Sequence, residues 1–491
     1  MPALYELNVP VYDNDLRANL VYTVVIGKLM AVWIPVYSEE WIYYDTEDGL
    51  VIFDYTGKEK TVTIPAFIGG KPVKAVLGTG QYLCYRWGAF YEKGVESVII
   101  GEGISAIWSN AFALGGLSSV LIPASVTCIG YDAFSGNKLT EIVIPPGVHT
   151  IEKQAFAYNC LTRAVISPGV RVIGERAFAY NTLTDITIPD TVTVIGEEAF
   201  THNELTGINI PESVTGIGSK AFSDNRLTAA FIPRSLDAIG GGVFADNPAL
   251  KAIVTDPENP SYTSVDGVLF SKDKTTLVSY PAGRGKEYAI PDGVKTIARF
   301  ACAGSQLEQV FIPGGVTAIG RAAFSNNQLT SVTIPPGVKT IAPFAFTRNK
   351  VTSVTIGMDV KLGGGGAGGF DDGFDFVYKQ GGKKAGTYTK TGDAWNYAPL
   401  DKELASAYLD IKTVARVKAK KAAAVLKKAA FVLGTMACVL PSLPVACFFL
   451  ASFLVQSLLL LIVSIPFIPY LCIRLAIRLF KRICGGKVFK A

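Results

Sequence analysis

The sequence predicts a mainly β solenoid, a coil of stacked short repeats, followed by an α-helical membrane segment. A 22-residue unit recurs between residues 85 and 357. Each unit contains an alternation of apolar and variable positions that is typical of a half-buried strand. Residues 429–473 contain no charged side chain. The first two observations indicate the solenoid, because repeats of this period stack around a continuous core, and the third indicates the membrane segment.

An isoleucine-proline pair marks each repeat. Its proline recurs with the period of the unit, except between Pro233 and Pro291, where one repeat and an inserted stretch separate the two prolines. The prolines of this grid are Pro123, Pro145, Pro189, Pro211, Pro233, Pro291, Pro313 and Pro335. Counting one repeat in which Cys302 replaces a recurrent phenylalanine, we identify eleven repeats.

Each part of the unit has an expected structural role. The stretch Leu-Thr-x-Val-x-Ile-Pro is rich in β-branched residues and predicts a strand, which the proline ends because it has no N–H donor. A second extended piece, Val-Thr-x-Ile-Gly, ends at a glycine that we expect to form a corner. The Ala-Phe pair supplies one large core ring per repeat. A recurrent asparagine is expected to form a buried ladder that satisfies backbone groups of the turns.

The combined pattern L-x-x-[VI]-x-I-P-x-x-V-x-x-I-G-x-x-A-F-x-x-N resembles the BspA-like leucine-rich repeats of bacterial surface proteins. The resemblance covers roughly residues 85–357, where many positions recur together. Residues 259–283 resemble a β-hairpin of that family, and residues 381–399 resemble its usual end segment. The resemblance implies a leucine-rich-repeat solenoid that acts in adhesion or protein binding rather than in catalysis, by analogy of fold.

The chain is expected to divide into six segments. Residues Leu20–Val36 are interpreted as strands of a cap rather than a signal peptide, because Asp13 and Asp15 precede them and Lys28 interrupts them. The segments are an N-terminal cap with an irregular first repeat (1–84), the leucine-rich repeat solenoid (85–357, insertion about 248–288), a glycine linker with a C-terminal β end segment (358–400), a basic helix (401–428), the transmembrane segment or segments (429–473) and a basic tail (474–491).

The uncharged run predicts an integral membrane protein with a C-terminal anchor. One membrane helix needs about 20 apolar residues, so the run is long enough for two crossings. The basic residues that flank it are Lys427, Lys428, Arg474, Arg478, Lys481 and Arg482. Under the positive-inside rule both flanks favour the cytoplasm, which a hairpin allows and a single span does not. The number of crossings and the side of the membrane that the repeats face stay open at this point.

Charge and cysteine usage limit the classes of partner. Residues 401–491 carry 14 Lys+Arg and 3 Asp+Glu, a balance of +11, which leaves −6 of the net charge of +5 for residues 1–400. The repeats offer no basic field for nucleic acid, so we expect no nucleic-acid partner. The eight cysteines show no metal-ligand spacing and are interpreted as free, mostly buried thiols.

No catalytic group of residues stands out, and we expect no enzymatic activity, cofactor or metal. The two histidines, His149 and His202, lie at variable positions of different repeats, without a companion at metal-ligand or triad spacing. The run Gly363–Gly369 lacks the Lys-Ser/Thr of a phosphate loop and is interpreted as a flexible linker.

The outward positions of the first strand in each unit form the candidate partner-binding face. Side chains alternate across a strand, so the residues that flank its second core position point outward. Stacking at about 4.8 Å would align the later of these positions into a strip. Contiguous exposed apolar area often marks an interface, although β-branched residues also suit any pleated surface. The candidate residues are Ile99, Leu121, Val143, Val165, Phe231 and Phe311.

These observations favour a non-catalytic, membrane-anchored leucine-rich-repeat protein that binds a protein or another cell-surface macromolecule, as an adhesin or scaffold. The alternative is a structural or membrane-organising protein, in which the basic hydrophobic tail acts on the bilayer and the solenoid is a spacer. Deletion of the tail separates the two hypotheses, because only the first predicts that ligand binding is retained.

Overall fold

The structure, a computed structural model of the whole chain, describes residues 35–78, 89–364, 368–371 and 373–400. These residues belong to one compact unit that spans residues 1–409. The basic helix, the transmembrane segment, the basic tail and their six flanking Lys and Arg residues lie outside the described residues, as do the cap strands expected before residue 35. Within the described ranges, no helix is long and apolar enough to cross a membrane.

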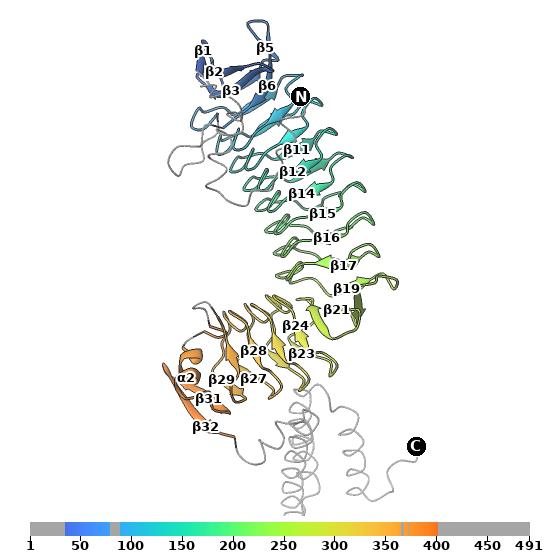
Figure 1. Cartoon of the computed structure of the whole chain (residues 1–491), viewed down its shortest axis with the longest axis vertical. Coiled ribbons are helices and arrows are strands. Elements are labelled where there is room, and N and C mark those ends of the chain that lie inside the picture. The colour runs from blue at the N-terminus through green and yellow to red at the C-terminus, as the bar shows by residue number, and fades with distance from the viewer. Residues whose placement is uncertain (1–34, 79–88, 365–367, 372, 401–491) are drawn as a thin grey trace, which may run out of the picture. The chain divides into compact units, whose positions relative to one another are not determined.

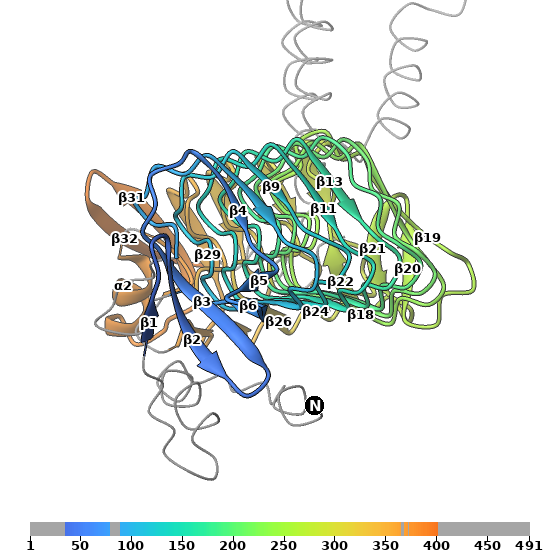
Figure 2. The same ribbon diagram turned by 90° about the horizontal axis from the view of Figure 1, so that it is seen from above.

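Most turns of the coil contribute two strands, and the strands stack into two columns (Figure 1). The two columns lie on different sides of the coil when it is viewed from above (Figure 2). Within a column, a strand pairs in parallel with the equivalent strand of the next turn, as Val143 pairs with Val165 and Ile129 with Ile151. Equivalent residues of successive turns therefore lie side by side, which is the arrangement that the repeat period predicts.

The first column holds the strands of the Leu-Thr-x-Val-x-Ile-Pro stretch. They are β4 (Thr61–Ile64), β7 (Ser97–Ile100), β9 (Ser119–Leu121), β11 (Glu141–Ile144), β13 (Arg163–Ile166), β17 (Ala229–Ile232), β19 (Ala252–Thr255), β23 (Glu287–Ala289), β25 (Gln309–Phe311), β27 (Ser331–Thr333) and β29 (Ser353–Ile356). Residues 185–188 and 207–210 occupy the same place without forming regular strands.

The second column holds the Ile-Gly strands and divides into two sheets. The first sheet contains β1 (Pro35–Tyr37), β2 (Trp41–Thr46), β3 (Gly49–Tyr55), β6 (Lys71–Val76), β8 (Ala106–Ile107), β10 (Cys128–Ile129), β12 (Thr150–Ile151), β14 (Val172–Ile173), β15 (Val194–Ile195), β16 (Gly216–Ile217) and β18 (Ala238–Ile239), and β5 (Phe67–Ile68) pairs with β6. The second sheet contains β20 (Tyr262–Val265), β21 (Val268–Ser271), β22 (Thr276–Ser279), β24 (Thr296–Ile297), β26 (Ala318–Ile319), β28 (Thr340–Ile341) and β30 (Lys361–Leu362).

The phenylalanine column forms the centre of the core, as the sequence predicts. Seven consecutive ring contacts run from Phe90 to Phe244, with centroids 5.0–6.1 Å apart and rings within 16° of parallel. These rings are almost completely buried. Cys302 occupies the equivalent position in its own turn. Its backbone N–H donates to the carbonyl of Ala323 in the next turn, just as the backbone N–H of Phe112 donates to the carbonyl of Ala133. The apolar interior is thus continuous from turn to turn between Phe90 and Phe244.

The asparagine column forms the expected buried ladder. The Asn203 side chain shows the pattern: its Oδ1 accepts the backbone N–H of Leu183, and its Nδ2 donates to the carbonyls of Phe178 and Phe200. The same bonds recur at Asn137, Asn159, Asn181, Asn225, Asn247, Asn327 and Asn349. Each asparagine satisfies buried backbone groups of two turns, which would otherwise lack partners.

The glycine of Ile-Gly has a different role from the expected corner. A Cβ on Gly196 would lie 2.6 Å from the backbone N of Glu175, in the preceding turn, so this position requires close approach of two backbones. The left-handed backbone positions lie instead two residues before and two residues after the core phenylalanine, where non-glycine residues such as Arg176 (φ 53°) and Tyr180 (φ 57°) occur. The period of the sequence shows that glycine recurs but does not distinguish these two reasons for it.

The inserted residues form an antiparallel hairpin of β20 and β21, which continues into β22. Strand β22 then pairs in parallel with β24, so the insertion joins the stack. Alternate side chains of β21 enter different cores: Leu269 packs with the preceding turns, whereas Val268 and Phe270 pack with the following turns. The insertion therefore separates the hydrophobic interior into two cores.

The solenoid has about fourteen turns, three more than the eleven repeats counted in the sequence. One turn, with β4 and β6, precedes the counted repeats, and a second is made by the insertion, where Tyr280 bonds to Ala301 in the register of the core phenylalanines. The last turn includes Gly368 and Gly369, whose carbonyls accept backbone N–H groups of the preceding turn. These two glycines are therefore part of the coil and not of the expected flexible linker.

Both ends of the core are closed by described residues. At the N-terminal end, Tyr55 stacks on Phe90 at 5.5 Å between ring centroids. At the other end, Phe370 stacks on Phe346 at 4.7 Å, and helix α2 (Phe374–Gln380) places Phe374 against Phe370. Strands β31 (Gly386–Thr391) and β32 (Ala394–Pro399) extend the first column beyond β29. With its core complete and capped, the unit of residues 1–409 meets the requirements for independent folding.

Candidate partner-binding surface

Four of the predicted residues form an aligned apolar strip on the outer face of the first column. Ile99 of β7 pairs with Leu121 of β9, and Val143 of β11 pairs with Val165 of β13. Ile99, Leu121 and Val143 are 38%, 62% and 57% exposed, and Val165 is half-buried. We call these four residues the apolar strip. The strands present them because their neighbours in sequence, such as Val98 and Ile142, fill the core.

The other two predicted residues, Phe231 and Phe311, are exposed but lie apart from the apolar strip. Phe231 of β17 pairs with Val254 of β19, and Phe311 of β25 pairs with Ala289 of β23. Between Val165 and Phe231 the same position holds Thr187 and Asn209, which interrupt the apolar surface. The structure therefore groups the six residues into one strip and two smaller patches.

Val254 is an exposed apolar residue that the sequence analysis missed. It is 49% exposed and continues the row of Phe231. Because the sequence places the start of the insertion at about residue 248, β19 falls within the expected insertion. The isoleucine-proline signal that identifies the other strands is replaced here by Thr255-Asp256, which explains the difference.

Charged side chains border the apolar strip on one side. Glu141 and Arg163 are paired across β11 and β13, two residues before Val143 and Val165, and both are exposed. Among the described residues, neither lies within ion-pair distance of an oppositely charged group. An apolar centre with a charged border is the composition that protein–protein interfaces favour.

A second group of exposed aromatic residues lies on the turns, and the sequence analysis did not identify it. Tyr158 stacks on Tyr180 at 4.5 Å between ring centroids, and Tyr180 contacts the ring of His202 at 4.3 Å. His202 Nε2 lies 3.1 Å from Asp224 Oδ2 in the next turn. All four residues stand two positions after a core phenylalanine, and this regular spacing is the signal that could have revealed them.

Of the three described cysteines, Cys302 is buried, Cys128 is half-buried and Cys160 is exposed, so the thiols are less buried than expected. His149 is exposed on a turn, and His202 belongs to the aromatic group. Burial raises the pKa of the Cys128 thiol to about 11 and raises the pKa of the Cys302 thiol still further, so both are protonated near neutral pH. Among the described residues, no group of His, Cys, Asp and Glu side chains could hold a metal ion.

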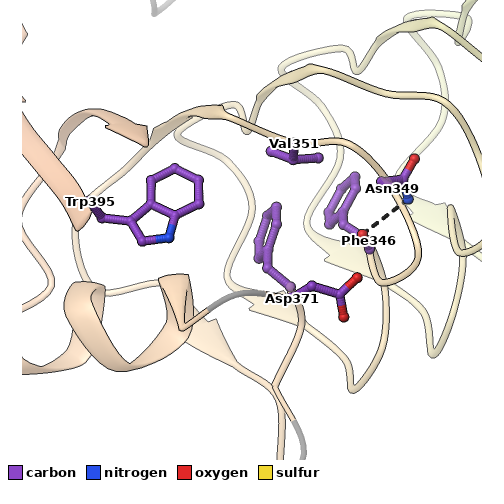
Figure 3. A pocket seen from close by; sticks show the side chains of 6 residues that line it. Phe346, Asn349, Val351, Asp371 and Trp395 are labelled. Atoms are coloured by element: carbon purple, nitrogen blue, oxygen red, sulfur yellow. Dashed lines mark hydrogen bonds between the residues drawn. The ribbon is translucent and has the colours of Figure 1, made fainter. Parts of the chain in front are cut away.

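The C-terminal end of the coil contains a small pocket, shown in Figure 3. Phe346, Asn349, Val351, Asp371 and Trp395 line it, together with Phe370, and its volume of about 10 Å³ is roughly that of one water molecule. Asn349 Nδ2 donates to the carbonyl of Phe346 at its wall. This pocket is far smaller than the hundreds of cubic ångströms of a small-molecule site.

The sequence profile described as "BspA type Leucine rich repeat region (6 copies)" matches residues 86–206, 171–284 and 284–364. Together these matches cover residues 86–364, which is more than half of the 491 residues. The chain therefore belongs to the BspA-type leucine-rich repeat family. No curated protein sequence matches the chain significantly.

Several solved structures are similar to this chain. A leucine rich cell surface protein from Faecalibacterium prausnitzii is 24% identical, with 67% of this chain and 89% of that chain covered and a TM-score of 0.46. The pneumococcal vaccine antigen PcpA is 23% identical, with 67% and 83% covered and a TM-score of 0.43. A leucine-rich repeat protein from Bacteroides ovatus is 19% identical, with 68% and 92% covered and a TM-score of 0.41. At these values the similarities carry no argument about function.

Proposed function

We propose that this protein is a non-catalytic recognition protein that binds a protein partner through the apolar strip. The observation that carries this proposal is the exposure of aligned apolar side chains on successive strands, where Leu121 is 62% and Val143 is 57% exposed. Contiguous exposed apolar surface of this kind is uncommon on monomeric proteins unless it binds something. The BspA-type family match is consistent with such a role.

The solenoid supplies a rigid platform for this surface. Each residue of the apolar strip lies on a strand that is hydrogen-bonded to its neighbours, and the next residue along each strand faces the core. Binding therefore requires little ordering of the platform, which lowers the entropic cost of association. The Glu141 and Arg163 side chains beside the strip would favour a partner with complementary charges, because opposed charges at an interface discriminate between partners.

The double substitution Leu121→Asp with Val143→Asp tests the proposal. Two carboxylates in place of the apolar side chains would have to be desolvated against the partner, so we expect binding to fall at least hundred-fold. The measurement is affinity capture from the producing cells, followed by titration of the captured partner against the variant. Thr333→Asp, at the same exposed position of β27, is the matched control and should leave binding unchanged. Undiminished binding by the double variant, with its circular dichroism melt unchanged, would reject the strip as the site.

We also propose that the chain is tethered to a membrane by residues 429–473. The support for this is the sequence, in which this long run is uncharged throughout and has basic residues at both ends. Extraction of cell membranes with alkaline carbonate should leave the full chain in the pellet, and release of the chain into the supernatant would contradict the tether. Protease treatment of intact cells, with an epitope tag after Asp273 in the exposed turn before β22, would then show the side that the repeats face.

A further inference from the structure

The C-terminal end of the coil presents a second exposed apolar surface, distinct from the apolar strip. Helix α2 lies over the end of the core, with Phe374 and Tyr378 buried. Phe376 and Lys379, three residues apart on the opposite face of this helix, are exposed, and Phe376 is 66% exposed. Residues three apart in a helix share one face. The outer face of α2 therefore displays a large apolar ring beside a lysine.

Neighbouring loops add to this surface. Met358 is 68% exposed and lies beside the C-terminal end of α2. Two hydrogen bonds fix this placement: Tyr378 Oη donates to the carbonyl of Gly357 at 2.6 Å, and the backbone N–H of Asp359 donates to the carbonyl of Lys383. After the helix, Lys384 is exposed and Lys383 is half-buried. We call this end of the coil, with Met358, Phe376, Lys379, Lys383 and Lys384 around α2, the cap face.

Of the carboxylates at this end, Asp375 is buried, whereas Asp359 and Asp371 are exposed. Asp375 is 8% exposed, and its two oxygens accept the backbone N–H groups of Gly369 and Phe370 at 2.9 Å. Asp371 accepts the backbone N–H of Arg348. In the described part of the chain, no carboxylate lies within ion-pair distance of the lysines of the cap face. Asp359 is the exposed carboxylate beside Met358.

We propose that the cap face binds the surface of an anionic phospholipid bilayer. Exposed Phe and Met side chains can enter the headgroup boundary, while the lysine stems lie along it with their ammonium groups at the phosphates. The chain supports this occupant, because β32 ends at Pro399 and the uncharged run begins at Ala429, after a short segment rich in lysine. A second copy of the cap face is disfavoured, since its lysines would repel those of the first.

The choice of a bilayer as the occupant rests on the proposed membrane tether, whereas the apolar strip plays no part in it. Because the test uses residues 1–409 alone, its outcome is distinct from that of the carbonate extraction, which uses the full chain. Co-sedimentation of this fragment with vesicles is the test, since its core is complete without the remaining residues. The probes are vesicles of phosphatidylcholine with about one third phosphatidylglycerol, compared with phosphatidylcholine alone. We expect binding to the anionic vesicles only, weakening as salt is raised, because each lysine near such a surface strengthens binding about five-fold.

The double substitution Phe376→Ser with Lys379→Glu should weaken vesicle binding at least ten-fold, and Lys379→Glu alone should weaken it about five-fold or more. Phe67→Ser and Lys251→Glu are the matched controls. Phe67 of β5 is 63% exposed and lies far from the cap-face residues in the sequence, and Lys251 is an exposed lysine of the solenoid. Both controls should bind like the parent fragment, as should Leu121→Asp in the apolar strip. Failure of the parent fragment to bind anionic vesicles, or equal losses in the cap-face and control variants, would overturn the proposal.

Discussion

The asparagine column shows how single residues hold the turns of this protein together. Each asparagine sits three positions after a core aromatic residue and binds backbone groups of its own turn and the preceding one, as Asn203 does with Leu183 and Phe200. Those backbone groups are buried, so no water replaces the side chain if it is removed. The sequence predicts this role because the amide recurs at a fixed position beside the core aromatic residue.

We predict that Asn203→Ala lowers the free energy of unfolding by about 3 kcal/mol, because it leaves buried N–H and carbonyl groups without partners. Denaturant unfolding followed by circular dichroism measures this change. Asn209→Ala, six residues away on the exposed face, is the control and should change stability by less than about 0.5 kcal/mol. Equal effects of the two substitutions would show that the ladder adds no stability.

The glycines of the repeat divide into those that permit close backbone approach and those that do not. We predict that Gly196→Ala destabilises the protein by about 1–3 kcal/mol, because the new methyl group would collide with the backbone of Glu175. Gly207→Ala should be neutral or slightly stabilising, since a Cβ there meets no atom within 4 Å and its φ is negative. Thermal melts of the two variants provide the comparison, and similar melting temperatures would contradict the assignment.

The insertion is the element whose fold the sequence shows only in part. Alternating residues and the Asp266-Gly267 pair indicate a hairpin. The placement of Leu269 in one core and of Phe270 in the other depends on the turns on both sides, which no local pattern contains. The core position of the inserted turn was missed because Ser279-Tyr280 replaces the Ala-Phe pair there, although Tyr280 lies 22 residues before Cys302, on the regular spacing of the repeat.

Two buried tyrosines make the protein sensitive to alkaline pH. Burial raises the pKa of Tyr280 and the pKa of Tyr388 from about 10 to about 12. Between pH 10 and 12 the unfolded chain releases these protons and the folded chain keeps them, so stability is full below pH 10 and falls as pH rises towards 12. We predict that Tyr280→Phe with Tyr388→Phe flattens this decline in urea unfolding measured at pH 9 to 12. A decline as steep as that of the parent protein would contradict the prediction.

At the scale of the whole molecule, the two cores are expected to unfold as separate blocks. Stability in a repeat protein depends on contacts between neighbouring turns, and β21 divides the interior between them. We predict that Phe178→Ala lowers the stability of the first block by about 3–5 kcal/mol and leaves the second nearly unchanged. Phe346→Ala should do the reverse. Hydrogen exchange with mass spectrometry resolves the two blocks, and a uniform loss of protection in either variant would argue for one cooperative unit.

The sequence predicts the solenoid more completely than it predicts the candidate surface. Core positions recur together and follow from the period alone, whereas exposure depends on what neighbouring turns and caps cover. Leu121 and Val143 are exposed as expected, but Val165 is half-buried. Phe376 and Met358 lie in unique segments without a repeat, so their exposure is visible only once α2 is seen to cover the end of the core.

Site-specific photo-crosslinking in the producing cells tests the central claim most directly. A benzophenone side chain would replace Leu121 or Val143 in the full chain. His149, exposed in the connection between β11 and β12, would serve as the comparison site. We expect one partner protein to become crosslinked at the two strip positions and not at position 149. Crosslinks at position 149 alone, or no crosslink at either strip position, would contradict recognition through the apolar strip.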